Sequence, residues 1–250
     1  MAMTRLLLEA PVFTVEAALK AAAFGVDRLE LCSDFGEGGE TPSAGALAFL
    51  KQKLEIPIFV MIRPRGGDFV YNEDEIAVMK KDIQILKSLG ADGFVFGVLN
   101  SDGNVNMGAC EELLEEAQGL PCTFHRAFDI SLNLEKSLEA IIECGFRRIL
   151  TSGGENSVSE GLKTIRKLIV NAADRILILP GGGLLPQHVP ILMEAGGLKE
   201  IHASCKTYRN SESTFIHPRV FLSNDPESFK SVLTISEYRV NQFLQAMKST

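Results

Sequence analysis

Short apolar runs alternate with helix-like stretches along this chain, and nearly every run ends in polar or glycine residues. Most runs are four to eight residues long, are rich in Val, Ile, Leu and Phe, and do not alternate apolar with polar positions. This pattern is typical of parallel strands buried on both faces, and strands that alternate with helices indicate βαβ units. The eight runs are Arg5–Ala10, Arg28–Cys32, Ile56–Arg63, Gly93–Leu99, Pro121–Arg126, Arg147–Ser152, Arg175–Leu179 and Glu200–Cys205.

The stretches between the runs carry helix start and stop signals. Thr14 can cap a helix that alanines continue to Phe24 and that Gly25 ends. Eight strands, each followed by a helix, predict a single-domain (β/α)8 TIM barrel over residues 1–250, a fold that typically needs about 250 residues. The rhythm breaks at residues 206–228, where the sequence predicts an irregular loop over the mouth of the barrel after strand eight. The other helices are expected from about Thr41 to Leu54, Asn72 to Gly90, Met107 to Gln118, Leu134 to Cys144, Glu160 to Ala172, Pro186 to Ala195 and Glu237 to Lys248.

Composition and charge exclude several classes of protein. The net charge is −7, and no Lys/Arg stripe suited to a duplex is present, so nucleic acid is not an expected partner. No apolar stretch approaches the roughly 20 residues of a membrane span, and Met1–Leu8 is too short for a signal peptide. The five cysteines are odd in number and form no C-x-x-C pair, which favours free thiols in the cytoplasm.

Two glutamates stand inside the apolar strands. Glu9 follows three leucines, and Glu30 lies between two more. A buried carboxylate needs a cation, a hydrogen-bond donor or a proton. Each glutamate is therefore a candidate catalytic acid or base, since the active sites of TIM barrels form at the C-terminal ends of the strands. The alternative is an internal ion pair with Arg63 or Arg126 that fills the barrel.

The densest motif follows the third strand, at Met61–Phe69. Arg63 and Arg65 are two residues apart, so in strand geometry both would point to the same face. Two guanidinium groups on one face suit a carboxylate or phosphate ligand. In the alternative, Arg63 pairs with a barrel glutamate and Arg65 is a solvated surface charge.

A second motif, Thr123–Asp129, ends the fifth strand. His125 can transfer protons near neutral pH, and Asp129 can orient its imidazole. Both are candidate catalytic residues, and Arg126 between them is a candidate anion ligand.

Small residues end the last three strands. Backbone N–H groups near Ser152, Gly182 and Gly183 can form an anion-binding nest, or these residues can simply form tight turns. His202 and Ser204 lie on one face of the eighth strand and complete the expected anion site. His202 is also expected to face Glu9 across the closed seam of the barrel.

Together these motifs resemble the CutC family, which is named for copper tolerance in bacteria and occurs also in animals. The resemblance covers roughly residues 5–210. The matching segments are Arg28–Cys32, Glu37–Ser43, Met61–Phe69, Thr123–Asp129, Leu150–Gly153 and Gly181–Gly183, followed by His202, Ser204 and Tyr208–Asn210.

The resemblance implies a TIM barrel, a homo-oligomer and a role in copper homeostasis, with copper(I) binding by some members and no firmly assigned reaction. Members often carry a cysteine two residues after the first strand glutamate, whereas this chain has Pro11 there. Cys32 matches the second cysteine of that neighbourhood and is the candidate copper(I) ligand, since copper(I) prefers thiolate and thioether ligands.

Three hypotheses about function follow. By resemblance, the chain is a CutC-type copper homeostasis protein that handles copper(I) through Cys32. From the residues themselves, it is an enzyme of unknown reaction that acts on a phosphate- or carboxylate-bearing small molecule, with Glu9, Glu30 and His125 as proton-transfer groups. The third hypothesis is a non-catalytic scaffold or binding protein that uses the outer helices.

Overall fold

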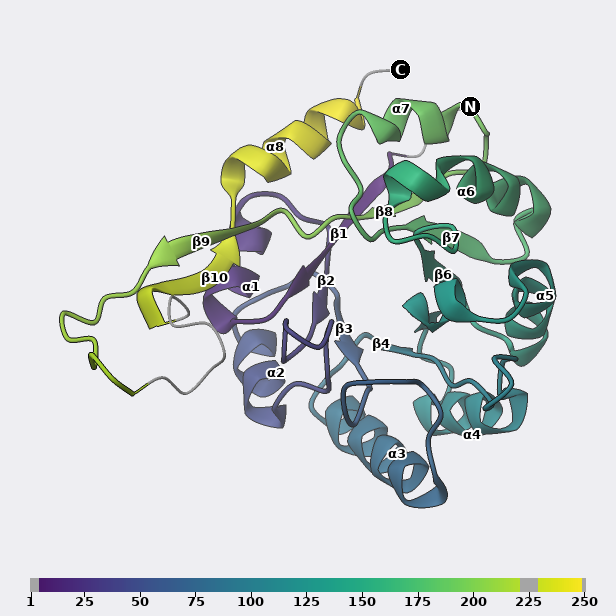
Figure 1. The fold of residues 1–250 in the computed structure, drawn as a ribbon, viewed down its shortest axis with the longest axis horizontal. Coiled ribbons are helices and arrows are strands. Elements are labelled where there is room, and N and C mark those ends of the chain that lie inside the picture. Colours follow the sequence, from purple (N-terminus) through teal and green to yellow (C-terminus); the bar gives the residue numbers. More distant parts are fainter. Residues whose placement is uncertain (1–4, 221–228, 249–250) are drawn as a thin grey trace.

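The computed structural model describes residues 5–220 and 229–248. Eight parallel strands stand in a ring with helices around the outside, which confirms the predicted (β/α)8 TIM barrel (Figure 1). The strands are β1 Leu7–Val12, β2 Arg28–Leu31, β3 Ile58–Met61, β4 Gly93–Phe96, β5 Cys122–Phe124, β6 Arg148–Thr151, β7 Leu177–Pro180 and β8 Glu200–His202.

The barrel closes where its first and last strands meet. β8 pairs in parallel with β1, and this register places Glu9 opposite His202. The strand order runs β7-β6-β5-β4-β3-β2-β1-β8, so the remaining gap lies between β7 and β8. The two strands approach closely just above this gap, because a Cβ on Gly181 would lie 2.9 Å from the Cβ of His202.

The helices follow the expected order, and most begin at a capping side chain. The Thr14 hydroxyl accepts a hydrogen bond from Ala17 N–H at the start of α1, and Asn72 and Glu75 form a capping box at the start of α3. The helices are α1 Val15–Ala23, α2 Ala44–Lys51, α3 Glu73–Ser88, α4 Met107–Ala117, α5 Leu134–Cys144, α6 Val158–Ala172, α7 His188–Met193 and α8 Glu237–Ala246. No helix among the described residues is both long and apolar enough to cross a membrane.

The prediction for residues 206–228 was wrong in its first part. Lys206–Asn210 form strand β9, which pairs antiparallel with β10, Ser231–Ile235, and Figure 1 shows this hairpin projecting beside α1 rather than over the barrel. Thr14, the N-cap residue of α1, donates a hydrogen bond to Leu233 O, and Glu16 of α1 accepts one from Arg209. The pairing of β9 with β10 could not be predicted from the sequence because the two strands lie more than 20 residues apart. Residues 221–228 of the predicted loop lie outside the described part of the chain.

The core has two parts that differ in chemistry. Between strands and helices lies a continuous apolar layer, and its largest fully buried side chains include Phe94, Phe96 and Phe124. Inside the barrel the filling is partly ionic. The guanidinium carbons of Arg28 and Arg148 lie 4.7 and 4.8 Å from the ring centre of Phe59.

Glu200 pairs with both arginines, and Glu9 pairs with Arg28, so two carboxylates balance the two guanidinium groups. Arg148, Arg28 and Glu200 are all at least nine-tenths buried. Because buried charges are tolerated only when paired, the three side chains form one unit at the floor of the barrel.

Candidate functional site

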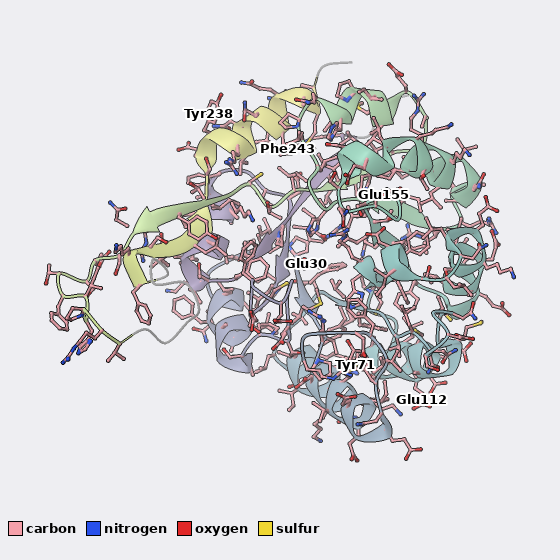
Figure 2. All side chains as sticks on the ribbon, in the orientation of Figure 1. Glu30, Tyr71, Glu112, Glu155, Tyr238 and Phe243 are labelled. Carbon is pink, nitrogen blue, oxygen red and sulfur yellow. The ribbon has the colours of Figure 1, made fainter. Side chains whose placement is uncertain are left out.

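A cavity of about 540 Å³ opens above this ionic floor, at the C-terminal ends of the strands. Figure 2 shows Glu30 near the middle of the ring of strands, where the cavity lies. Nine of the predicted site residues line the cavity: Glu30, Arg63, His125, Arg126, Asp129, Gly182, Gly183, His202 and Ser204. The other four, Glu9, Cys32, Arg65 and Ser152, do not.

Glu9 lies beneath the cavity and is fully buried. Arg28 Nε lies 2.5 Å from one of its carboxylate oxygens, and His202 Nδ1 lies 2.8 Å from the other. Burial alone would raise the pKa of Glu9, but Arg28 and His202 outweigh burial and lower it to about 2. Glu9 therefore stays ionised and holds its neighbours. Its partner is Arg28 rather than Arg63 or Arg126, and the expected contact with His202 is confirmed.

His202 stands between two carboxylates. Its Nδ1 faces Glu9, and its Nε2 lies 3.8 Å from Glu30 Oε2. Burial lowers the pKa of His202, but the hydrogen bond to Glu9 and the charges of both glutamates raise it above its usual value. This geometry favours a positively charged imidazole in contact with the cavity.

Glu30 has the opposite character to Glu9. Burial is the main reason that its pKa rises to about 7, although the nearby charge of His202 lowers it. Its Oε1 atom is buried and has no hydrogen-bond partner within residues 5–220 and 229–248. Glu30 can therefore gain or lose a proton near neutral pH, as an acid–base catalyst must.

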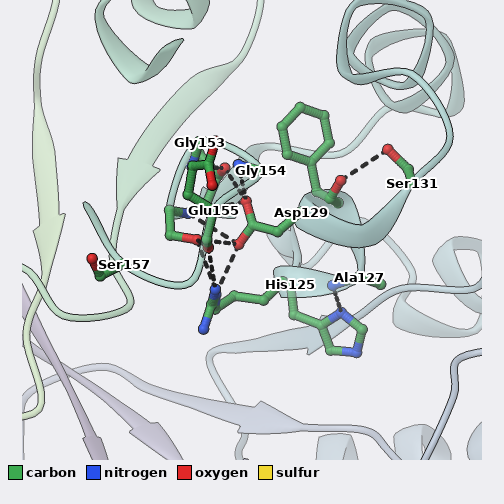
Figure 3. Close-up of polar contacts among 12 residues, drawn as sticks. His125, Ala127, Asp129, Ser131, Gly153, Gly154, Glu155 and Ser157 are labelled. Carbon is green, nitrogen blue, oxygen red and sulfur yellow. Dashed lines mark hydrogen bonds and ion pairs between the residues drawn. The ribbon is translucent and has the colours of Figure 1, made fainter. Parts of the chain in front are cut away.

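His125 follows β5 and caps the 3-10 helix η1, Arg126–Ile130. Its Nδ1 accepts a hydrogen bond of 3.2 Å from Ala127 N–H (Figure 3). Burial, and secondly the charge of Arg63, lower the pKa of His125 to about 3, so the ring is neutral. Asp129 does not orient the imidazole, because its carboxylate is bound elsewhere.

Asp129 organises the loop after β6. Figure 3 shows its carboxylate surrounded by donors, which include Ser152 N–H at 3.0 Å, Gly154 N–H at 3.0 Å and the Thr151 hydroxyl at 2.5 Å. Arg126 Nε donates to it at 2.8 Å. Both carboxylate oxygens are occupied by these donors, so the structure favours a positioning role for Asp129 over the predicted catalytic one.

The contact with Asp129 places the guanidinium of Arg126 beside the C-terminal end of β7. Its side chain is 40% exposed, and a Cβ on Gly182 would lie 3.0 Å from its guanidinium carbon. Gly182 has a φ of +87°, so glycine meets both the conformational and the steric demand. Ser152 contributes from below, through its hydroxyl contact with Arg126 at 2.7 Å.

The two arginines of the third-strand motif diverge. β3 ends at Met61, so strand geometry does not extend to Arg63 and Arg65. Arg63 turns into the cavity wall, where it donates to the carbonyl oxygens of Glu37, Gly39 and Gly67, while its buried Nε has no partner in the described chain. Arg65 turns outward.

Asp68 and Glu75 hold Arg65 outside the cavity, at Nη2–Oδ1 3.1 Å and Nε–Oε1 2.5 Å. The expectation that both arginines share one face was therefore wrong, and Arg65 is the surface charge of the alternative interpretation.

The sulfur atoms lie at the side of the cavity. Cys32 packs with Met61, and a Cβ on Gly39 would lie 3.4 Å from Cys32 Sγ and 3.5 Å from Met61 Cε. Burial and the carboxylate of Glu30 raise the pKa of Cys32 well above its usual value. Pro11 lines the cavity nearby. Within the described residues, no three or more His, Cys, Asp or Glu side chains are arranged to hold a metal ion.

Sequence analysis missed the ionic floor of the barrel. Arg28, Arg148 and Glu200 each begin a strand, where a polar residue looks like an ordinary boundary. Residues two positions apart on a strand point to the same face. Arg28 is two positions before Glu30 and Glu200 is two before His202, so this spacing could have predicted that Arg28 and Glu200 point into the barrel.

The fold and this site define a TIM-barrel protein with a cavity lined by charged side chains at the C-terminal face of its strands. Residues 6–207 match the CutC family, and the chain belongs to it. A human relative, "Copper homeostasis protein cutC homolog", is 44% identical over 93% of this chain and 82% of its own length. A CutC family protein of Agrobacterium fabrum is 45% identical over 80% of this chain and 79% of its own length.

Solved structures agree on the fold. The crystal structure of CutC from Streptococcus agalactiae has a TM-score of 0.74 and 36% identity, and the match covers 80% of this chain and 98% of that one. An aldolase, QR15, has a TM-score of 0.63 at 17% identity, covering 82% of this chain and 92% of that one. The second likeness supports the barrel fold alone.

Proposed function

We propose that the cavity is the active site of an enzyme that transfers a proton on a small anionic molecule. The observation that carries this proposal is the unpaired Oε1 of Glu30, a buried carboxyl oxygen at the wall of the cavity whose pKa is about 7. A structural carboxylate inside a barrel is normally paired, as Glu9 is. Glu30 is instead free to react.

The two glutamates divide the work through their surroundings. Glu9, held by Arg28, keeps its charge and binds His202, whereas the contact of Glu30 with His202 Nε2 is longer, at 3.8 Å, and its other neighbour is the Cys32 thiol. Environments that push two pKa values apart are a common signature of acid–base sites. In this arrangement Glu30 exchanges the proton, and His202 with Glu9 fixes the local charge.

Arg126 supports an anionic ligand. Its guanidinium lines the cavity, is partly exposed, and is held in place by Asp129 and Ser152. A planar guanidinium in a fixed orientation recognises phosphate and carboxylate groups well. Gly182 and Gly183, which also line the cavity, allow a ligand to approach the backbone at the end of β7.

The test measures anion binding by thermal shift with phosphoglycolate and malate as probes. At least one probe should raise the melting temperature of the wild type, and Arg126→Met should lose most of that shift. Arg175→Met is the matched control, because Arg175 also pairs with one carboxylate but lies outside the cavity. Equal shifts in wild type and Arg126→Met, or no shift with either probe, would contradict the proposal.

Copper(I) handling is the second candidate, favoured by one observation. Cys32 and Met61 place a thiol and a thioether together beside the cavity, and these are ligands that copper(I) prefers. The names of the curated relatives point the same way. The buried thiol would have to give up its proton despite its raised pKa, and Pro11 supplies no second thiolate. We therefore rank it second.

A copper(I) competition titration separates the two candidates. If this pair holds copper(I), Cys32→Ser and Met61→Leu should each weaken binding by tenfold or more, whereas Cys144→Ser, on the outer helix α5, should not. Equal affinity in all four proteins would exclude Cys32 as the site.

The setting of the protein belongs to the same proposal. All five cysteines are free, which suits a reducing compartment such as the cytoplasm. Assembly into a homo-oligomer is part of the proposal and can be measured by light scattering.

A further inference from the structure

The hydrogen bonding of His125 fixes which ring nitrogen carries its proton. Ala127 N–H donates to Nδ1 at 3.2 Å, so Nδ1 must present a lone pair. A neutral imidazole with an acceptor at Nδ1 carries its proton at Nε2. His125 Nε2 is buried and has no hydrogen-bond partner within the described residues. His125 also lines the cavity, so an unused N–H donor stands at its wall.

The neighbours of the ring hold it in place and keep it uncharged. Phe69 contacts it with ring centres 4.6 Å apart and ring planes tilted by 55°, and Phe124 meets it edge-on at 6.1 Å. Just after β4, a Cβ on Gly97 would lie 2.9 Å from Nδ1, so no side chain fits between this segment and the ring. The charged group that faces it is Arg63, whose guanidinium lies over the same Phe69 ring at 4.9 Å. This cation opposes a second proton on His125.

The other histidine of the cavity shows what a different environment does. His202 contacts two carboxylates, Glu9 and Glu30, while the described residues place no carboxylate in an ion pair with His125. The two histidines of the cavity thus have opposite surroundings. The carboxylates beside His202 favour its charged form, whereas the surroundings of His125 favour a neutral donor.

We propose that His125 Nε2–H donates a hydrogen bond to a carbonyl oxygen of the substrate, which makes the substrate a small anionic ketone or aldehyde. This inference rests on the proposed function of the same cavity, where Glu30 exchanges a proton and Arg126 binds the anionic group. It adds the chemical class of the reacting part of the substrate.

The step that these groups perform is proton abstraction next to the carbonyl. The C–H bond on the adjacent carbon breaks and its proton passes to Glu30 Oε1. The electron pair of that bond forms a C=C double bond, and the π electrons of the carbonyl group move onto its oxygen to give an enolate. His125 Nε2–H stabilises that oxygen. The reverse step returns the proton from Glu30 to carbon, so the step balances without an oxidant or reductant.

A neutral donor suits this chemistry for a physical reason. The hydrogen bond from Nε2–H strengthens as negative charge develops on the oxygen, and the rigid ring needs no reorganisation to make it. Neutral imidazoles whose pKa is lowered by their surroundings polarise carbonyl groups in other barrels. The contacts with Phe69 and Phe124 hold the ring in place here.

The first measurement is the tautomer itself. Nitrogen-15 NMR of histidine-labelled protein should show His125 as the neutral Nε2–H form from pH 6 to 8. An imidazolium or an Nδ1–H form in that range would overturn the inference.

The second measurement follows exchange of carbon-bound hydrogen with deuterium oxide by proton NMR. The probes are dihydroxyacetone phosphate and pyruvate, one phosphate-bearing and one carboxylate-bearing ketone. The wild type should exchange at least one of them, and His125→Phe, which keeps a ring against Phe69, should lose about a hundredfold or more of the rate, as loss of one oxyanion donor typically does.

His188→Phe is the matched control. Its Nδ1 also accepts a backbone hydrogen bond, from Leu185 N–H at 3.1 Å, but His188 lies outside the cavity, so exchange should remain at the wild-type rate. Exchange by His125→Phe at the wild-type rate, or none by the wild type with either probe, would overturn the inference. If phosphoglycolate or malate still binds through Arg126, the proposed function survives that result, and if neither binds, both fail.

Discussion

The Nδ1 atom of His202 lies 2.8 Å from Glu9 Oε1, so a side chain from the last strand of the barrel holds one from the first. Through its other nitrogen the same ring approaches Glu30, the carboxyl group with an unpaired oxygen at the cavity. Closure of the barrel and the protonation of the site are thus physically connected.

Removing the charge of Glu9 should damage both closure and protonation. Glu9→Gln leaves Arg28 with Glu200 alone and takes the hydrogen-bonded anion from His202. Breaking a buried ion pair typically costs about 3–5 kcal/mol, so we expect a loss of about 3 kcal/mol in the free energy of unfolding. The pKa of His202 should also fall. Urea denaturation and NMR titration measure the two effects, and an unchanged His202 titration would contradict the assignment.

Glu30 should make stability depend on pH in a defined direction. Its pKa is about 7 in the folded protein against 4.5 for an unperturbed glutamate, so between these values the folded state binds the extra proton. The contribution of Glu30 to stability is present below pH 4.5 and is lost as the pH rises toward 7, by up to roughly 1.4 kcal/mol per pH unit.

Glu30→Gln should remove that dependence. Urea denaturation at pH 5, 6 and 7 should show the variant gaining stability relative to the wild type as the pH rises. His202 has a raised pKa and titrates in the same direction, so the comparison must be between proteins rather than within one curve. Glu73→Gln, on the exposed start of α3, should run parallel to the wild type.

Asp129→Asn should disorder the anion site without touching the acid–base group. In the wild type, Oδ1 accepts from Ser152 and Gly154, and Oδ2 accepts from Ser152 and Arg126, so the amide nitrogen would face donors at either position. Hydrogen bonds to charged groups contribute about 1.5–3 kcal/mol each, so a loss of about 2 kcal/mol in unfolding free energy is expected. The affinity for phosphoglycolate or malate, measured by thermal shift, should fall at least tenfold. Full retention of that affinity would show that Asp129 does not position Arg126.

Gly182→Ala should act on the same arginine from the other side. The added Cβ would lie 3.0 Å from the guanidinium carbon of Arg126, and the φ of +87° disfavours alanine. Strain of this kind costs about 1–3 kcal/mol. We expect anion affinity to fall by about tenfold. Gly196→Ala is the control, because Gly196 has a similar φ of +72° and nothing within 4 Å of its Cβ position, so stability should fall but anion affinity should not.

The barrel could be predicted from sequence because its strands are local. Runs such as Ile58–Met61 are buried on all sides and read as uninterrupted apolar segments, and glycines such as Gly25 mark the helix ends. The β9/β10 hairpin could not be predicted in this way. Its two strands are half-exposed and distant in the chain, and their pairing depends on packing against α1.

The site was predictable as a set of residues but not as a set of partners. Convergence of strand ends placed Glu30, His125 and Arg126 at one cavity. The cation that neutralises Glu9 depends on the strand register and on which side chains point into the barrel. Strand β3 ends at Met61, so Arg65 turns toward Asp68 and Glu75 instead. Side-chain direction beyond a strand end is set by the loop, which a residue count alone does not determine.

The pairing of β1 with β8 has a consequence for synthesis of the protein. A ribosome releases Glu9, Arg28 and Glu30 early, whereas His202 emerges nearly two hundred residues after Glu9. Until then Glu9 lacks its imidazole partner, and no truncated nascent chain can contain the finished site. The complete wall of the cavity therefore forms only after the final strand docks.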